Sequence, residues 1–157
     1  MPFIIVDKVN AKVFLFGPDG RLLGASRALL GAAHGDHSVP GIGDRKISSI
    51  LPEERTTPAG RFVASLGHNG SNKDILWVHY ADAISLHRVI AGSPKERRAQ
   101  RLASESADDK RITYGCINVP VAFYEKLVVP AFTRTTGIVY VLPEVKTVQT
   151  VFNMASK

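Results

Sequence analysis

Short apolar runs separated by turn residues constrain the fold of this chain more than any other feature. Residues 3–7 and 11–16 form two such runs, and the Gly-Pro-Asp-Gly segment at 17–20 predicts a tight turn into a returning strand at 21–26. Further runs occupy residues 61–66, 74–80, 84–90 and 137–142. Runs of this length that alternate between apolar and polar residues are typical of half-buried strands. The sequence therefore predicts a mainly β protein.

Two helices are predicted beside the strands. Ser93 would cap the first helix, Pro94 suits its first turn and Glu96 completes a capping box, so this helix is expected to run to about residue 103. Asn118 is a favourable cap for a second helix, which Pro130 is expected to end. The apolar face of this second helix would consist of Phe123, Tyr124, Leu127 and Val128.

The composition is that of an ordinary globular protein. Of the 157 residues, 45% are hydrophobic and 22% are charged, and we expect them to form one domain spanning residues 1–157. No apolar run approaches the roughly 18–20 residues of a membrane helix, so no transmembrane segment is expected. The first residues lack the regions of a secretory signal, which leaves two alternatives: a cytosolic protein, or one whose export signal lies outside this chain.

A formal net charge of +6 favours polyanionic partners, and part of the excess lies within residues 95–111. Anionic cell-wall polymers, carboxylated peptides and nucleic acid all fit this charge, whereas a solvated helix face explains the cluster equally well. No nucleic-acid-binding motif accompanies the charge, so nucleic acid is not an expected partner.

Cys116 is the only cysteine of the chain, so it has no disulfide partner within the chain. His87 lies upstream, near the end of a strand-like run, and a lone cysteine with a distant histidine is a candidate thiolate nucleophile with its base. A helix start after Cys116 and a nearby imidazolium would both lower the pKa of the thiol. Backbone N–H groups around Tyr114, Gly115 and Cys116 could form an oxyanion hole. The alternative is a buried, inert cysteine.

Three segments carry a resemblance to a known family. Thr113-Tyr114-Gly115-Cys116-Ile117-Asn118 resembles the Ser/Thr-His-Gly-Cys-apolar-Asn/Arg signature of the L,D-transpeptidase catalytic domain family, often called the YkuD family. Ile84-Ser85-Leu86-His87 is similar to the strand that carries the catalytic histidine of that family, and residues 57–62 are similar to its Thr-Pro-x-Gly-x-Phe turn. The three matches occur in the order of the family, which makes the set more specific than any one of them.

The resemblance implies a mainly β fold with two or so helices, a YkuD-like β-sandwich. It implies that Cys116 is the nucleophile and His87 its base. Gly115 would belong to the oxyanion-hole turn, and the hydroxyl of Thr113 would help hold the histidine or the loop. Asn118 would support the loop and contact the substrate.

Two departures from the family are specific to this chain. Tyr114 replaces the usual histidine before the glycine, so the imidazole at this position is absent. The backbone N–H of Tyr114 remains, and its side chain is a candidate for binding the substrate. The interval between His87 and Thr113 is longer than in the family, because residues 93–110 form a basic insert that could be a lid, a rim of the cleft or a passive elaboration. His79 shares a strand face with Trp77, so it could line the cleft and bind substrate, or be a partly exposed strand histidine.

By this resemblance, the expected function is L,D-transpeptidation of peptidoglycan stem peptides through a thioester, with no cofactor and no metal. It also implies carbapenem sensitivity and a periplasmic or cell-envelope location. One alternative is an L,D-carboxypeptidase or amidase of the same fold that uses water as acceptor, including release of a peptidoglycan-linked protein. The other is a basic binding module for wall polymer or nucleic acid with an inert cysteine.

Overall fold

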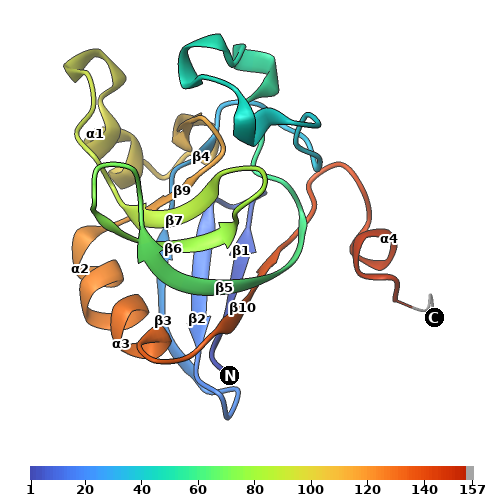
Figure 1. Cartoon of the computed structure of the whole chain (residues 1–157), viewed down its shortest axis with the longest axis vertical. Helices are drawn as coiled ribbons and strands as arrows, with labels where there is room; N and C mark the ends of the chain where they lie inside the picture. Colours follow the sequence, from blue (N-terminus) through green and yellow to red (C-terminus); the bar gives the residue numbers. More distant parts are fainter. Residues whose placement is uncertain (155–157) are drawn as a thin grey trace.

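The computed structural model describes residues 1–154 and shows a mainly β protein with few helices, which confirms the fold class expected from the sequence (Figure 1). No helix within these residues is both long enough and apolar enough to cross a bilayer. The strands, in chain order, are β1 (Phe3–Asp7), β2 (Lys12–Phe16), β3 (Leu22–Arg27), β4 (Leu30–Gly31), β5 (Gly60–His68), β6 (Asp74–His79), β7 (Ile84–Arg88), β8 (Arg111–Thr113), β9 (Ile117–Val119) and β10 (Gly137–Val141).

One curved sheet of eight strands dominates the structure, in the order β3-β2-β1-β10-β5-β6-β7-β9, and β4 pairs with β8 beside it. The long strand β5 turns the corner of this sheet: its residues up to Ala64 pair with β10, whereas Ser65 and those after it pair with β6. Figure 1 shows β5 curving from β10 towards β6. The two halves of the sandwich are therefore parts of one sheet that folds back on itself.

The sheet nearly closes beside β9. Leu29, which follows β3, exchanges two backbone hydrogen bonds of 2.8 and 3.0 Å with Asn118 on β9. On its other side β9 runs parallel to β7, and Asn118 lies opposite His87 in the register. Residues that are far apart in the sequence therefore meet at this edge through main-chain pairing.

Strand alternation explains which side chains form the core. Ile4 and Val6 of β1 and Val13 and Leu15 of β2 are 0% exposed, whereas the residues between them lie on the other face. Each such side chain stabilises the fold by about 1.5–3 kcal/mol when it is removed from water. The core continues onto the helical segment that packs beside the sheet, from which Phe132 is 1% exposed (Figure 1).

That helical segment comprises α2 (Val121–Phe123), a π-helical stretch η6 (Tyr124–Val128) and α3 (Val129–Phe132). The prediction that Asn118 caps it was wrong: Asn118 lies in β9, because pairing with two neighbouring segments outweighs its local capping preference. Pro130 does not end the segment as predicted but lies within α3. The residues before Pro130 form a π-helix, whose hydrogen bonds differ from those of an α-helix. The regular α-helical bonding that a proline would interrupt is therefore already broken at this point.

The insert of residues 93–110 contains η4 (Pro94–Glu96), α1 (Arg98–Ala103) and η5 (Asp108–Lys110). The prediction of one continuous helix to residue 103 was wrong, because Arg97 adopts the left-handed conformation with φ of 51° and separates two short helices. Ser93 does accept a hydrogen bond from the Lys95 N–H, at 3.3 Å. Glu96 pairs with Arg98 instead of closing a capping box.

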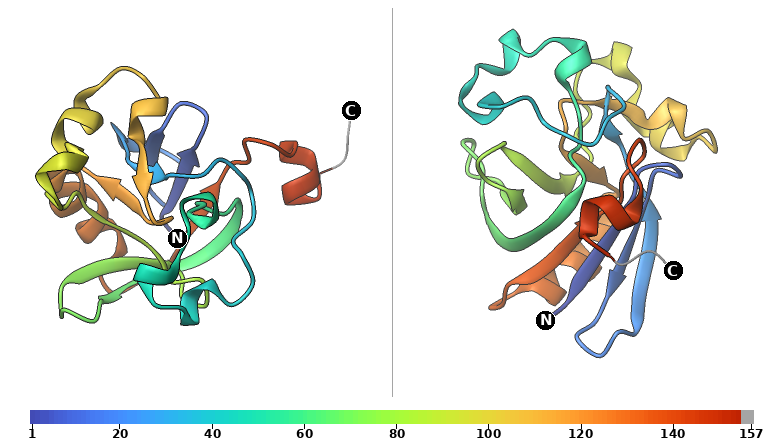
Figure 2. Two further views of the ribbon diagram at one scale, coloured as in Figure 1. Left: turned by 90° about the horizontal axis from the view of Figure 1, so that it is seen from above. Right: turned by 90° about the vertical axis from the view of Figure 1, so that its right-hand side faces the viewer.

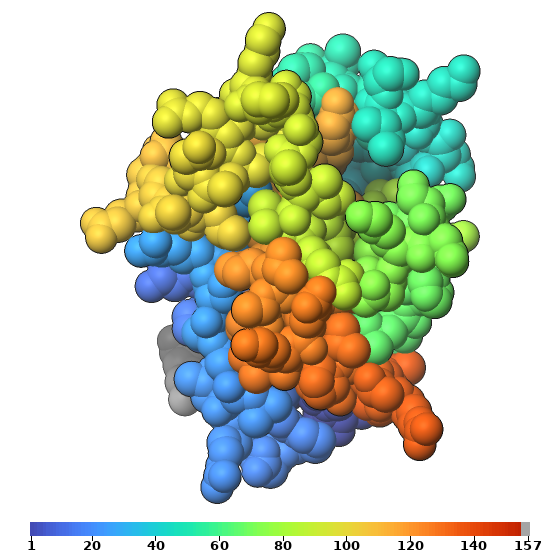
Figure 3. Space-filling model, turned by 90° about the vertical axis from the view of Figure 1, so that its left-hand side faces the viewer, coloured from blue at the N-terminus to red at the C-terminus, as the bar shows by residue number. Residues whose placement is uncertain are grey.

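The connection between β4 and β5 contains three short 3-10 helices, η1 (Ile42–Asp44), η2 (Ile47–Ser49) and η3 (Pro52–Glu54). We call residues 38–56 the cap segment. An ion pair of 2.7 Å between Arg45 and Glu54 holds this segment in shape. The cap segment and the insert rise at the same end of the molecule, with a hollow between them, whereas α4 (Val148–Phe152) stands to one side (Figures 2 and 3).

A buried group of charges fixes both the start of the cap segment and the chain after β10. The Lys8 ammonium is 0% exposed and contacts Asp36 at 3.0 Å and the Thr57 carbonyl at 2.8 Å. Asp36 also accepts three backbone N–H groups, and Glu144 pairs with Arg111. Burial raises the pKa of Asp36, but these backbone donors and Lys8 outweigh it and lower the pKa to about 2. We call Lys8, Asp36, Arg111 and Glu144 the Lys8 cluster.

Candidate functional site

The fold brings Cys116 and His87 together. His87 lies on β7, and Cys116 directly precedes β9, the parallel neighbour of β7. The thiol of Cys116 lies 3.5 Å from the Ser85 hydroxyl and 3.5 Å from the Ala83 carbonyl. His87 Nδ1 lies 2.7 Å from the carbonyl oxygen of Arg88. A carbonyl only accepts hydrogen bonds, so Nδ1 carries a proton and Nε2 is left as the basic nitrogen of the neutral ring.

The electrostatics of the pair favour charge separation. Burial raises the pKa of the Cys116 thiol, but hydrogen bonding to His87 and Ser85 and the charge of His87 bring that pKa below its ordinary value. Burial likewise lowers the pKa of His87, but its interaction with Cys116 moves it above the ordinary value. The helix start expected after Cys116 contributes nothing, because a strand follows it instead.

The turn before Cys116 is held by one hydroxyl. Thr113 donates to the Cys116 carbonyl at 2.6 Å and accepts the Gly115 N–H at 3.1 Å. Its hydroxyl therefore holds the loop rather than the histidine. Gly115 has a φ of 132°, and an added Cβ would lie 2.8 Å from the carbonyl oxygen of Thr56, so this turn requires glycine.

The Thr-Pro turn packs directly behind this loop. Thr57 is 0% exposed, and its hydroxyl donates to the Gly115 carbonyl at 2.7 Å while it accepts the Gly31 N–H at 2.9 Å. The three sequence segments that carry the resemblance therefore meet at one place, although they are far apart in the chain. The role of Thr57 follows from this contact and from no local sequence signal.

Two main-chain donors beside the cysteine have no hydrogen-bond partner in the part of the chain that the structure describes. Within residues 1–154, no acceptor hydrogen-bonds to the backbone N–H of Tyr114 or of Cys116, whereas that of Gly115 is occupied by Thr113. Unpaired N–H groups next to a nucleophile can stabilise negative charge on an oxygen under attack.

Cys116 opens into a cavity of about 260 Å³ beneath the cap segment. Isoleucines form much of its wall, and Arg45 and Asp82 add charge to its rim. Tyr114 borders it too, with the Arg55 guanidinium 4.1 Å above its ring. Residues of the cap segment therefore shape the space in front of the thiol. The isoleucines that line the cavity are Ile42, Ile47, Ile50 and Ile84.

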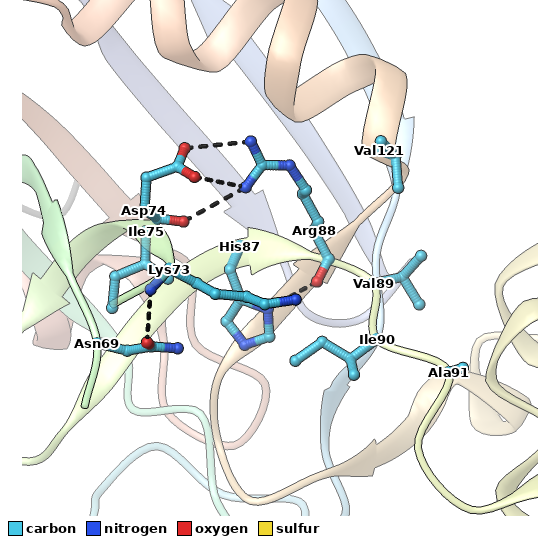
Figure 4. A pocket seen from close by; sticks show the side chains of 10 residues that line it. All are labelled: Asn69, Lys73, Asp74, Ile75, His87, Arg88, Val89, Ile90, Ala91 and Val121. Carbon is cyan, nitrogen blue, oxygen red and sulfur yellow. Dashed lines mark hydrogen bonds and ion pairs between the residues drawn. The ribbon is translucent and has the colours of Figure 1, made fainter. Parts of the chain in front are cut away.

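His87 borders a second cavity of about 250 Å³, which Cys116 does not line (Figure 4). Figure 4 shows Arg88 held away from the ring by its ion pair with Asp74, at 2.9 Å. Val121 and Ile90 form apolar parts of this wall. Cys116 and His87 thus each border a different cavity.

The remaining predicted site residues occupy different positions. Asn118 is 1% exposed and lies beneath the histidine, with its Nδ2 3.4 Å from His87 Nε2. His79 pairs with Asp82 at 2.8 Å and contacts the Phe62 ring, but it borders neither cavity. No group of three or more His, Cys, Asp or Glu side chains among residues 1–154 is arranged to hold a metal ion.

Sequence reasoning missed two residues of this site. Ser85 lies two residues before His87 on β7, so strand alternation could have placed it on the same face. Arg98 contacts Asn118 at 2.9 Å from the insert, and no local pattern indicates that contact.

Comparison by sequence finds no matching family model and no matching curated protein. Comparison by structure finds the helical cell shape determining protein Pgp2 from Campylobacter jejuni, with a TM-score of 0.61 at 15% identity. A second structure, of a mutant of that protein, gives a TM-score of 0.59 at 13% identity. The matches cover 93% of this chain but only 49% and 48% of those chains. The chain therefore shares their fold over about half of their length.

Proposed function

We propose that this protein is a cysteine-dependent L,D-transpeptidase that acts on peptidoglycan stem peptides. The observation that carries the proposal is the Cys116–His87 pair, in which a partly buried thiol has a lowered pKa and opens into a cavity. An inert structural cysteine needs none of these properties.

The first half-reaction follows from the geometry. The Cys116 sulfur attacks the carbonyl carbon between the L-centre of a diamino acid and a terminal D-residue, and His87 Nε2 takes the thiol proton. The Arg88 carbonyl holds the ring in the required tautomer. The unpaired N–H groups of Tyr114 and Cys116 stabilise the oxyanion. When the carbon–nitrogen bond breaks, His87 returns the proton to the leaving amine, and a thioester remains.

The second half-reaction needs an acceptor. The amine of a second stem peptide attacks the thioester, gives a proton to His87 and forms the cross-link, and the protonated ring restores the thiol. The cavity beside His87, which is distinct from the one that Cys116 lines, offers space for this second peptide. This second cavity is why we favour transfer to an amine over hydrolysis.

The other site residues have supporting roles in this proposal. Thr113 and Gly115 shape the turn that presents the thiol, and Tyr114 forms a wall of the substrate cavity. Asn118 supports His87 and does not contact substrate, because its side chain is almost completely enclosed. His79 orients Asp82 at the cavity rim.

The structural likeness to a cell shape determining protein supports a wall-directed function and a place in the cell envelope. A cysteine site of this kind would also be acylated by carbapenems, because the lactam carbonyl would react with the same thiolate. We expect a mass increase by one lactam that is absent in the Cys116→Ala variant.

The deciding experiment is mass spectrometry of products after incubation with purified disaccharide-tetrapeptide muropeptides. The variants are Cys116→Ala and His87→Gln, and the matched control is His68→Gln at an exposed position. We expect cross-linked dimers from the wild type and the control, none from Cys116→Ala, and a loss of about 10²–10⁴-fold from His87→Gln.

Two other results would change the proposal. Cys116-dependent tripeptide without dimers would identify an L,D-carboxypeptidase instead. The absence of any Cys116-dependent product would contradict the substrate, and salt-dependent binding of wall polymer would then favour a binding module.

A further inference from the structure

The insert reaches the candidate catalytic histidine through one side chain. Arg98, the first residue of α1, donates from Nη1 to Oδ1 of Asn118 at 2.9 Å. Its side chain is only 13% exposed, and its Nε donates to the Glu96 carboxylate of the same insert. The guanidinium is therefore held from two directions next to the buried edge of the sheet.

This contact determines which way the Asn118 amide faces. Arginine can only donate hydrogen bonds, so the amide oxygen must point to Arg98 and the NH₂ group must point to His87. The resulting distance from Nδ2 to His87 Nε2 is 3.4 Å. An NH₂ group placed there is compatible with an unprotonated Nε2 and repels a protonated one. Arg98 thereby favours the neutral ring that a general base requires.

The charge of Arg98 acts on the histidine in the same direction. Burial lowers the pKa of His87 and interaction with Cys116 raises it, and the positive charge of Arg98 is a further influence that lowers it. The titratable and charged groups around the ring are Cys116, Arg98 with its partner Glu96, Lys73, and the Arg88–Asp74 pair.

The chain before the insert is shaped around the Glu96–Arg98 pair. Gly92 has a φ of 60°, and an added Cβ would lie 2.9 Å from the Glu96 carboxylate and 3.2 Å from Arg98 Nε. The backbone therefore passes close to the pair, in a conformation that favours glycine.

We propose that Arg98 is a positioning residue for His87, which acts through Asn118, and that the insert is thereby an integral part of the active site. This inference rests on the proposed role of the Cys116–His87 pair, but it does not depend on the identity of the substrate. The signature that the cysteine segment resembles carries Asn or Arg at the position of Asn118. This chain has the uncharged residue there, and the insert supplies a cation through Arg98 instead.

The first test measures the titration of His87 by NMR, in a Cys116→Ala background that uncouples it from the thiol. The chain has five histidines, and His87→Gln identifies the signal of His87. In Arg98→Met we expect the midpoint to rise by about 0.5–1 pH unit, because a nearby positive charge is lost. Arg98→Lys keeps the charge but not the planar fork that holds the Asn118 amide, so its midpoint should rise by less than that of Arg98→Met.

The second test measures the rate at which iodoacetamide alkylates Cys116 at neutral pH. Both Arg98→Met and Arg98→Lys should react faster than the wild type, Arg98→Met by at least about 3-fold, because neither holds the Asn118 amide as the guanidinium fork does and a more readily protonated His87 stabilises the thiolate. Arg97→Met is the matched control: this neighbouring arginine is exposed, and its side chain makes no hydrogen bond within residues 1–154, so its rate should equal that of the wild type. Far-UV circular dichroism verifies that each variant is folded.

The proposal is overturned if Arg98→Met leaves both the midpoint and the alkylation rate unchanged, or if Arg97→Met changes them equally. If Arg98→Met does not fold, Arg98→Lys decides through its alkylation rate. Neither test contains peptidoglycan, so failure of the proposed substrate would leave this result intact. A wild-type alkylation rate in His87→Gln would instead contradict the nucleophile–base pair itself.

Discussion

The Lys8 cluster and the Cys116 site are both buried groups of polar side chains, but they differ in how completely they are bonded. In the Lys8 cluster, Asp36 meets Lys8 at 3.0 Å and accepts backbone N–H groups at 2.6–3.0 Å. At the Cys116 site the thiol, a weak hydrogen-bonding group, contacts the Ser85 hydroxyl and the Ala83 carbonyl at 3.5 Å, and His87 Nε2 lies 3.4 Å from Asn118 Nδ2, which is long for two nitrogen atoms. The backbone N–H groups of Tyr114 and Cys116 are unpaired within residues 1–154.

This difference separates two uses of buried polarity. A charged network in which every ionised group has an opposite partner fixes the arrangement of the segments that contribute to it, because any loss leaves an uncompensated charge, even though Arg111 Nε of the Lys8 cluster has no partner within residues 1–154. An incompletely bonded site keeps the capacity to bind and react, since its donors and its nucleophile are not satisfied by the protein. We therefore expect substitutions in the Lys8 cluster to reduce stability and those at the Cys116 site to reduce activity.

The largest effect should come from Cys116→Ala. We expect Cys116-dependent product formation to fall by at least about 10³-fold. The free energy of unfolding should change by less than about 1 kcal/mol, because a thiol forms only weak hydrogen bonds. Muropeptide turnover and urea denaturation measured on the same preparation would test both parts. A large loss of stability would show that the cysteine is structural.

Lys8→Met should produce the reverse pattern and destabilise the protein by about 3–5 kcal/mol, because Asp36 and Glu144 lose a buried countercharge. Lys12→Met at an exposed position of β2 is the matched control and should change stability by less than about 0.5 kcal/mol. Urea denaturation midpoints measure both variants. Equal midpoints would contradict a structural role of the cluster.

The next effect is on the pH dependence of stability, because the Lys8 cluster contains carboxylates. The pKa of Asp36 is lowered from 3.8 to about 2 in the folded protein, so its carboxylate stabilises the fold above pH 4. This contribution, about 2 kcal/mol, should be lost as the pH falls from about 5 towards 2. The pKa of Glu144 is also lowered, which acts in the same direction. Asp36→Asn should flatten the pH dependence of the unfolding free energy, whereas Asp108→Asn, at an exposed position, should not.

Thr57→Val should reduce stability by about 1–2 kcal/mol, less than Lys8→Met, because it removes one buried hydroxyl that bonds to Gly115 and Gly31. It should also slow alkylation of Cys116, since the turn that presents the thiol loses its support. Thr133→Val removes an exposed hydroxyl and serves as control. An unaltered alkylation rate would show that the turn keeps its shape without Thr57.

Sequence patterns predicted the strands well and the helices less well. The runs at residues 3–7, 11–16 and 137–142 correspond to strands, and so does the return after the turn at 17–20. The capping role of Asn118 was wrong because sheet pairing outweighed a local preference. The insert is broken at Arg97, where the chain adopts a left-handed conformation that its capping signals did not indicate.

Local information was sufficient for the mainly β character, for Cys116 and His87 as candidate reactive groups, and for a special turn at Gly115. These features depend on residue type and on the spacing of near neighbours, and both can be read directly from the sequence. The tertiary structure decided that Thr57 supports the cysteine loop, that Arg98 reaches Asn118, and that the charges around Lys8 are buried together. Those contacts join residues that are distant in sequence, and only the pairing and closure of the sheet bring them within hydrogen-bonding distance.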